Sequence, residues 1–338
     1  VRAGPDSMDP HWSTLGGQAE ALRHVFDTVV MADAKLGLKP GLAVSWKPVD
    51  ETTWEFKIRQ GVKFHDGSEL TAEDVKFSID RIPVVTGPMS MTIYTKQVKE
   101  TKVVDKYTLH VITKAVAPTL PNDFIRLFVV PKSIGMEARN EQFNSGKAAI
   151  GTGPYKFVSW TPKGDMVMER FDGYWGEKQP WQKVVRKEIP SDPARIAALK
   201  SGQVDLVNYV PATDYAAMQR DKSVDTFIAD TVYILNITPN VKETLPKPAK
   251  VDGKEIAANP LRDPKVREAM DLAIDRKTLV RVVLEGLGKP ANQLMPSNFF
   301  GGSTKLPERP YDVNKAKKLL ADAGYPKGFE LDFFCTNN

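Results

Sequence analysis

The most regular alternation of hydrophobic and polar residues lies between residues 54 and 81, WEFKIRQGVKFHDGSELTAEDVKFSIDR. Apolar residues occupy every second position of 54–58, and this period of two predicts a strand with one face on a core. Residues 62–64 continue the alternation after a glycine turn and predict a second strand. Thr71 and Asp74 have the spacing of a capping box, which predicts a helix directly afterwards.

Periodicity and end signals predict the other elements. Helices are expected at residues 17–30, 120–129, 192–200, 213–220, 263–274, 275–284 and 315–323. Strands are expected at 103–111 (as a hairpin), 155–160, 166–171, 184–189, 204–209, 224–229, 232–237 and 329–334. The alternation of strands and helices after residue 184 predicts an α/β domain with part of its sheet parallel. Residues 238–260 are rich in proline and lack either period, which predicts a linker or a surface insertion.

Length and charge set the broad class of the protein. The 338 residues exceed one comfortable hydrophobic core, so two or more domains are expected. Lys and Arg number 47 against 42 acidic residues, and the net charge of +5 is spread along the chain without a run of like charges. A nucleic-acid partner or a membrane surface is therefore not supported. The chain begins at Val1 with no charged and apolar leader, so we expect any signal peptide to be absent already.

Candidate catalytic and metal-binding groups are sparse. The one cysteine, Cys335, excludes an internal disulfide and a cysteine-based zinc site, and its apolar neighbours at 331–334 predict a buried, inert thiol. There is no Gly-x-Ser-x-Gly elbow, and no two histidines have a metal-ligand spacing. We therefore expect no catalytic residue, no metal and no cofactor. The histidines are His11, His24, His65 and His110.

The glycine-rich stretch at residues 151–154, GTGP, does not have the form of a phosphate-binding loop. Pro154 intrudes, and an alternating strand follows where a phosphate loop would open a helix. We interpret the stretch as a turn by which the chain re-enters its first domain. The many scattered carboxylates do not single out a glycosidase pair. A hydrolase acting on a peptide or glycoside, and a protein-interaction scaffold, remain as alternatives to small-molecule binding.

Four stretches in fixed order carry a family resemblance. The stretch at 54–81, with its order W-x-F-x-[IL]-R-x-G-V-K-F-H-D-G and L-T-A-E-D-V-x-F-S, resembles the large periplasmic solute-binding proteins that serve oligopeptide, dipeptide and nickel ABC importers. GTGPYKFVSW with its continuation to residue 176, ARIAALKSGQVDLV from Ala194, and DPKVREAMDLAIDRKTLV from Asp263 resemble the same family in the same order. Together the four matches extend over most of the chain.

The resemblance implies a two-lobed, periplasmic-binding-protein-like α/β fold with a subdomain inserted in the first lobe. The first lobe is expected at 1–32 and 149–237, the inserted subdomain at 33–148, and the start of a second lobe at 238–338. In the resembling family the second lobe continues beyond the point that matches Asn338. The second lobe is therefore expected to be incomplete, with Leu331, Phe333 and Phe334 exposed and ligand affinity lower than that of an intact chain.

The resemblance also implies where a ligand binds. In the first lobe, the loop after the first strand and the Met- and Tyr-rich region after the capped helix are expected to face the cleft. A hinge is expected near residues 235–239, where Asn236 either contacts the ligand or fixes a strand end; the second role is favoured. The complete set of expected ligand-binding residues is His11, Trp12, Ser13, Thr14, Gln18, Met89, Met91, Tyr94 and Asn236.

The function that the resemblance implies is solute capture for an ABC importer. An oligopeptide is the leading ligand, and a nickel chelate, haem or an oligosaccharide are the alternatives within the same fold. The expected partner is a permease in the inner membrane, and the protein is expected to be a periplasmic monomer. Two hinged lobes that close over a solute exclude water and make binding depend on the open and closed states.

Overall fold

The computed structural model describes residues 1–335 as two compact units. Unit 1 is Val1–Val210, and unit 2 begins at Pro211. Each unit is considered separately below. The lobe boundaries expected at residues 32, 148 and 237 stay a prediction.

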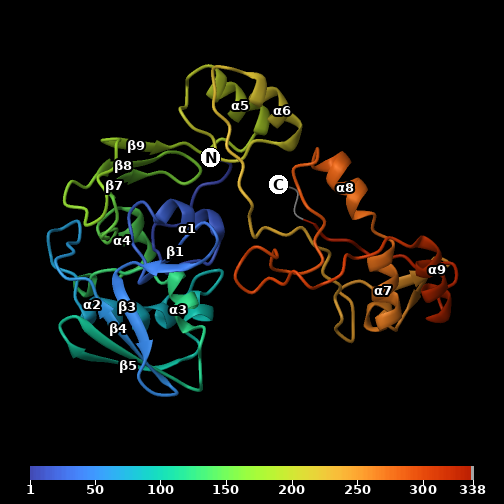
Figure 1. Ribbon diagram of the computed structural model, residues 1–338, viewed down its shortest axis with the longest axis horizontal. Helices are drawn as coiled ribbons and strands as arrows, with labels where there is room; N and C mark the ends of the chain where they lie inside the picture. The colour runs from blue at the N-terminus through green and yellow to red at the C-terminus, as the bar shows by residue number, and fades with distance from the viewer. Residues whose placement is uncertain (336–338) are drawn as a thin grey trace. The chain divides into compact units, whose positions relative to one another are not determined.

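A four-stranded antiparallel sheet is the largest sheet of unit 1 (Figure 1). Its order is β3 (Ala43–Pro48), β4 (Thr53–Ile58), β6 (Thr108–Thr113) and β5 (Val98–Asp105). The hairpin of β5 and β6 and the strand β4 confirm the alternation in the sequence. Helix α2 (Ala72–Arg81) packs on the side of β5 and β6, and its apolar face joins the core of this sheet.

The start of α2 has the predicted capping box. The backbone N–H of Thr71 donates to Asp74 Oδ2 at 2.9 Å. The predicted strand at 62–64 is wrong: within it only Lys63 makes a bridge, to Glu69. The turn leads so directly into the helix cap that there is no room for a ladder. The apolar side chains of 62 and 64 are nevertheless buried, as the alternation requires.

Two predicted helices of unit 1 end early for one shared reason. Helix α1 (Gly16–Leu22) and helix α3 (Leu120–Asp123) are much shorter than the patterns at 17–30 and 120–129 predict. Residues 27–29 instead pair with residues 127–129, with Val29 N–H on Leu127 O at 3.0 Å and Val129 N–H on Asp27 O at 3.0 Å. This non-local pairing uses backbone groups that a continued helix would need. The apolar side chains at 21–22 are buried in the helix, and those at 29–30 are buried in extended backbone.

The rest of unit 1 includes a second antiparallel sheet, of β7 (Tyr155–Trp160), β8 (Met166–Arg170) and β9 (Lys183–Arg186), which confirms the three strands predicted there. Unit 1 has two large apolar clusters, one built from residues 29–129 and the other from residues 8–26 and 128–168. Its remaining elements are β1 (Val30–Ala32), β2 (Leu38–Pro40), η1 (Ile82–Val84), η2 (Met91–Tyr94), η3 (Phe124–Arg126), η4 (Lys132–Ile134), α4 (Asn140–Asn144) and α5 (Asp192–Lys200).

Unit 2 is mainly helical. Asp263 and Asp275 accept hydrogen bonds from the first turns of the helices that they precede, at the predicted helix starts. Asp312 caps the last helix in the same way, two residues before the predicted start at residue 315. Gly286 and Gly324 follow helices with φ of +80° and +89°, the left-handed conformation typical of helix ends. The elements are α6 (Ala212–Arg220), β10 (Ala249–Val251), β11 (Lys254–Ile256), η5 (Pro260–Arg262), α7 (Pro264–Leu272), α8 (Arg276–Val283) and α9 (Val313–Asp322).

Four predicted strands are wrong. Residues 204–209, 224–229 and 232–237 form no strand, and 329–334 contributes only the bridge of Glu330 to Lys250. Every ladder between named strands of the described chain is antiparallel, so the partly parallel sheet is also wrong. Within residues 1–335, the runs at 204–209, 224–229 and 232–237 pair with no strand, and Phe227 is 94% and Tyr233 81% exposed.

The apolar run near residue 335 also differs from one expectation. Cys335 is exposed, so the prediction of a buried thiol is wrong. The reason is the same lack of strand partners, since an unpaired segment does not carry its side chains into a core. Phe333 and Phe334 are exposed, as expected, and Leu331 is half-buried.

Candidate functional site

The structure joins the two segments of unit 1 that were expected to contact a ligand. Ser13 and Met89 form a parallel bridge, and the backbone N–H of Thr14 donates to Met89 O at 3.2 Å. Between the segments, a Cβ atom on Gly87 would lie only 1.7 Å from the carbonyl oxygen of Trp12. The approach is thus possible because residue 87 lacks a side chain. Residues 75 positions apart form one continuous surface.

The expected site residues of unit 1 fall into two groups by exposure. Met89 is 48% exposed, and Trp12, Thr14 and Tyr94 are half-buried. These four side chains retain surface that a ligand can reach. The other four are buried: His11, Ser13, Gln18 and Met91.

His11 belongs to a buried polar network rather than to the surface. Arg81 forms an ion pair with Asp9 at 2.6 Å, and its Nη1 donates to His11 Nδ1 at 2.9 Å. The Nε2–H of His11 donates to Phe128 O at 2.9 Å, so both ring nitrogens are used. Burial, and then the neighbouring Arg81, lower the pKa of His11 to about 4. The ring is therefore neutral at pH 7 and holds the loop in place.

Gln18 and Asn236 also bond within the protein. The amide of Gln18 donates to Asp9 O at 3.1 Å and accepts from the Asp6 N–H at 3.2 Å. Gln18 thereby fixes the loop that leads into the surface described above. Asn236 belongs to unit 2, is exposed, and donates to Thr238 Oγ1 at 2.9 Å. The assignment of all nine residues to a ligand site stays a prediction.

Unit 1 also has a buried carboxylate, Asp27, that the sequence did not single out. Asp27 Oδ2 accepts from Trp175 Nε1 at 2.8 Å and from Thr152 Oγ1 at 2.9 Å, and Tyr174 OH donates to Oδ1 at 3.4 Å. Burial raises the pKa of Asp27 to about 6. Arg59 covers the Trp175 ring at 4.4 Å from the centroid.

The Asp27 group fixes the turn at 151–153 rather than offering chemistry. A Cβ on Gly151 would lie 1.9 Å from Val25 O, so the turn packs directly on the backbone beside Asp27. The interpretation of the turn as the point where the chain re-enters its first domain stays a prediction. In the sequence, the pair of glycines was the only signal of this group. The hydrogen-bond partners Thr152 and Trp175 lie 125 and 148 residues after Asp27, so no local pattern connects them.

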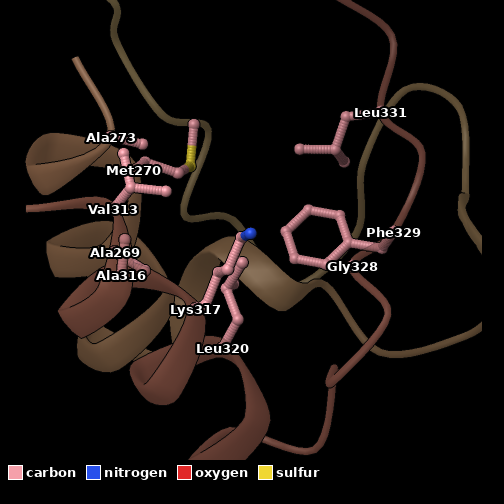
Figure 2. Close-up of a pocket in the computed structure, with 10 residues that line it drawn as sticks. All are labelled: Ala269, Met270, Ala273, Val313, Ala316, Lys317, Leu320, Gly328, Phe329 and Leu331. Atoms are coloured by element: carbon pink, nitrogen blue, oxygen red, sulfur yellow. The ribbon is translucent and has the colours of Figure 1, made fainter. Parts of the chain in front are cut away.

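Unit 2 has a separate apolar pocket of about 340 Å³ between α7, α9 and residues 328–331 (Figure 2). Lys317 is the charged side chain that reaches it, and its ammonium group points into the space beside Phe329. No group in this lining has the arrangement of a nucleophile with a base. The lining residues are Ala269, Met270, Ala273, Val313, Ala316, Lys317, Leu320, Gly328, Phe329 and Leu331.

Within residues 1–335, no group of three or more His, Cys, Asp or Glu side chains is placed to hold a metal ion. In the same residues, every helix is too short or too polar to cross a bilayer. Unit 1 thus has two joined loops with polar and apolar side chains at the surface, and buried hydrogen bonds that hold the first of these loops in place.

Comparisons with known proteins agree with the resemblance. The dipeptide-binding protein of Escherichia coli (strain K12) is 29% identical over 356 residues, which cover 98% of this chain and 63% of the relative. Heme-binding protein A of Haemophilus influenzae is 28% identical over 319 residues, which cover 88% of this chain and 56% of the relative. The chain thus spans less than two thirds of the length of these curated relatives.

A solved structure of a periplasmic binding protein, DppA from Helicobacter pylori in complex with the peptide STSA, is similar with a TM-score of 0.75 and 25% identity. The match covers 96% of this chain and 65% of that one. It confirms the periplasmic-binding-protein-like, two-lobed α/β fold class. Residues 37–338 match the family described as bacterial extracellular solute-binding proteins, family 5 Middle. This chain therefore belongs to the family 5 extracellular solute-binding proteins.

Proposed function

We propose that this protein captures a solute for an ABC importer and delivers it to a permease in the inner membrane. The observation that carries the proposal is the family match over residues 37–338. The proposed ligand is an oligopeptide, which is supported by the name of the E. coli relative and by the peptide in the H. pylori structure. Haem, a nickel chelate and an oligosaccharide are the alternative ligands; the H. influenzae relative is named for heme.

The proposed ligand surface in unit 1 is formed by Trp12, Thr14, Met89 and Tyr94. The support is their remaining exposure and the contact between their two segments. His11 and Gln18 are buried, so their proposed role is indirect. Their hydrogen bonds fix the loop that bears Trp12 and thereby hold this surface in place. Asn236 is proposed to stabilise the chain at the hinge near 235–239 through Thr238.

The protein is proposed to act by binding alone, as a periplasmic monomer without a nucleic-acid partner or a cofactor. The relatives named for binding support the absence of turnover, and the periplasmic description of the H. pylori protein supports the compartment. A hydrolase acting on peptides or glycosides is the alternative from another class. No nucleophile and base stand together in the candidate surface to favour it.

Native mass spectrometry of the purified protein, followed by calorimetric titration, tests the proposal. The peptide Ser-Thr-Ser-Ala, haem and nickel-histidine are titrated separately into the same preparation. We expect a retained or titratable peptide and unchanged peptide mass after prolonged incubation. Haem or nickel-histidine binding without peptide binding would select an alternative ligand. Peptide cleavage that follows the purified protein would replace the binding function with a hydrolase.

A further inference from the structure

Two runs of the chain without Asp, Glu, Lys or Arg meet in unit 1. Residues 10–19 (PHWSTLGGQA) and 82–95 (IPVVTGPMSMTIYT) contain none, although 26% of the chain is charged. The bridge between Ser13 and Met89 joins them. The remaining titratable side chain in the first run, that of His11, is buried and uncharged at pH 7 because its pKa is lowered to about 4.

Three of the four charges at the borders of these runs are in ion pairs. Asp9 precedes the first run and Arg81 the second, and the two side chains form the ion pair at 2.6 Å with 2% and 0% exposure. Glu20, after the first run, pairs with Arg186 at 3.3 Å. Lys96, after the second run, is exposed. A ligand at the joined runs therefore meets no charged side chain from either run.

The exposed side chains of the joined runs are uncharged: Thr86 and Ser90 are exposed, and several large exposed side chains are apolar. Leu15 is 41%, Met89 48% and Ile93 53% exposed, and Trp12 and Tyr94 are half-buried. We call the surface of these five residues the neutral surface. Covering an apolar surface stabilises a complex by about 25 cal/mol for each Å² removed from water. A charged ligand group placed here would lose part of its hydration without gaining an oppositely charged partner from either run, which is unfavourable.

We propose that the neutral surface receives an uncharged, apolar side chain of a bound peptide and discriminates against acidic and basic side chains at that position. This inference rests on the proposed function and adds a selectivity to it. Under this proposal, contacts that neutralise charged groups of the peptide are made by other parts of the protein. Met89 is the most informative residue, because it links the two runs through its backbone and is exposed through its side chain.

The test is nuclear magnetic resonance of the full chain labelled with ¹³C at the methionine methyl groups, which detects weak as well as tight binding. Met136, also exposed (36%) but outside the two runs, is the matched control. Signals are assigned with Met89→Leu and Met136→Leu. The ligands are Ala-Phe-Ala, Ala-Glu-Ala and Ala-Lys-Ala. We expect Ala-Phe-Ala to shift the Met89 signal and not the Met136 signal, with apparent affinity at least about tenfold above the charged peptides.

Equal shifts of Met89 with all three peptides would overturn the selectivity and leave peptide capture intact. Absence of peptide binding in both titration and spectra would overturn peptide capture itself, and the inference with it. A second variant keeps the two apart. Met89→Glu places a carboxylate on the neutral surface and should raise the affinity for Ala-Lys-Ala while lowering that for Ala-Phe-Ala. Met136→Glu should change neither, and an unchanged preference in Met89→Glu would contradict the inference.

Discussion

Gly87 lies so close to Trp12 that a Cβ atom on residue 87 would be 1.7 Å from the Trp12 carbonyl oxygen. Non-bonded atoms do not approach to this distance, so any other residue at position 87 must push the backbone of Trp12 away. The contact brings together the segments at residues 10–19 and 82–95, which are remote in sequence. The proposed ligand surface thus depends on one glycine that is not itself part of it.

Gly87→Ala should therefore separate the two loops. We expect a loss of unfolding free energy of about 1–3 kcal/mol from overpacking, together with weaker peptide binding. Chemical denaturation and calorimetric titration measure the two effects. Gly17→Ala is the control, because a Cβ there has nothing within 4 Å and lies in helix α1. It should raise the unfolding free energy by about 0.5–1 kcal/mol. Equal behaviour of the two variants would mean that the loops do not meet in solution.

The ion pair beneath these loops should be the most sensitive polar contact in unit 1. Arg81→Met leaves the Asp9 carboxylate buried without its partner, and breaking a buried pair in this way costs about 3–5 kcal/mol. Thermal and urea unfolding measure the loss. Lys76→Met, in the same helix, breaks a pair with Asp80 that is more than one third exposed and should cost about 0.3–0.5 kcal/mol. A similar cost for both would show that the Arg81 network is hydrated.

Local signals in the sequence were enough for the elements whose stability is local. The capping box at Thr71, the hairpin of β5 and β6, and the helix-ending Gly286 each depend on residues within one or two turns. The helix predicted at 17–30 failed because residues 27–29 find backbone partners about 100 positions away. The strands predicted at 224–237 failed because an apolar run forms a strand only beside another one.

The two loops of the candidate site were selected by the family resemblance, and their role in binding stays a prediction. The structure shows that the two loops meet. Composition does not show how deeply each side chain is buried. His11 and Met89 both belong to these loops, yet His11 is 0% and Met89 48% exposed. The Asp27 cluster was missed altogether, because its hydrogen bonds join residue 27 to side chains more than 100 positions later.

Asp27 should make stability depend on pH in an unusual direction. Because burial raises its pKa to about 6, the folded protein binds this proton more tightly than the unfolded chain does. The contribution is fully present below the ordinary carboxyl pKa and is lost as the pH rises through about 6. The rise of the Asp27 pKa from its ordinary value to about 6 corresponds to about 3 kcal/mol of unfolding free energy. Asp27→Asn should abolish this dependence while its amide oxygen still accepts from Trp175 and Thr152.

The measurement is the difference in unfolding free energy between wild type and Asp27→Asn at pH 4 to 7. The difference is needed because burial lowers the pKa of His11 and of His65 to about 4, and these groups destabilise the fold as the pH falls below 6.5. The unfolding free energy of Asp27→Asn minus that of wild type should be more positive at pH 7 than at pH 4. Asp33→Asn, at an exposed carboxyl whose pKa is lowered by backbone N–H groups, should not share this trend. A pH-independent difference for Asp27→Asn would contradict the raised pKa.

Trp12 offers the sharpest separation of binding from packing. Its side chain is half-buried, and its backbone is held by Gly87 and by the hydrogen bond of its N–H to Asp9 O at 3.2 Å, so the loop does not depend on the indole. Trp12→Ala should therefore weaken peptide binding by about tenfold or more, as expected for a large aromatic contact, with a small change in melting temperature. Trp181→Ala, at a tryptophan that is 67% exposed elsewhere in unit 1, is the matched control and should leave affinity unchanged. Titration and thermal unfolding of both variants decide the matter. A lower melting temperature with unchanged affinity in Trp12→Ala would make this indole part of the core and remove it from the ligand surface.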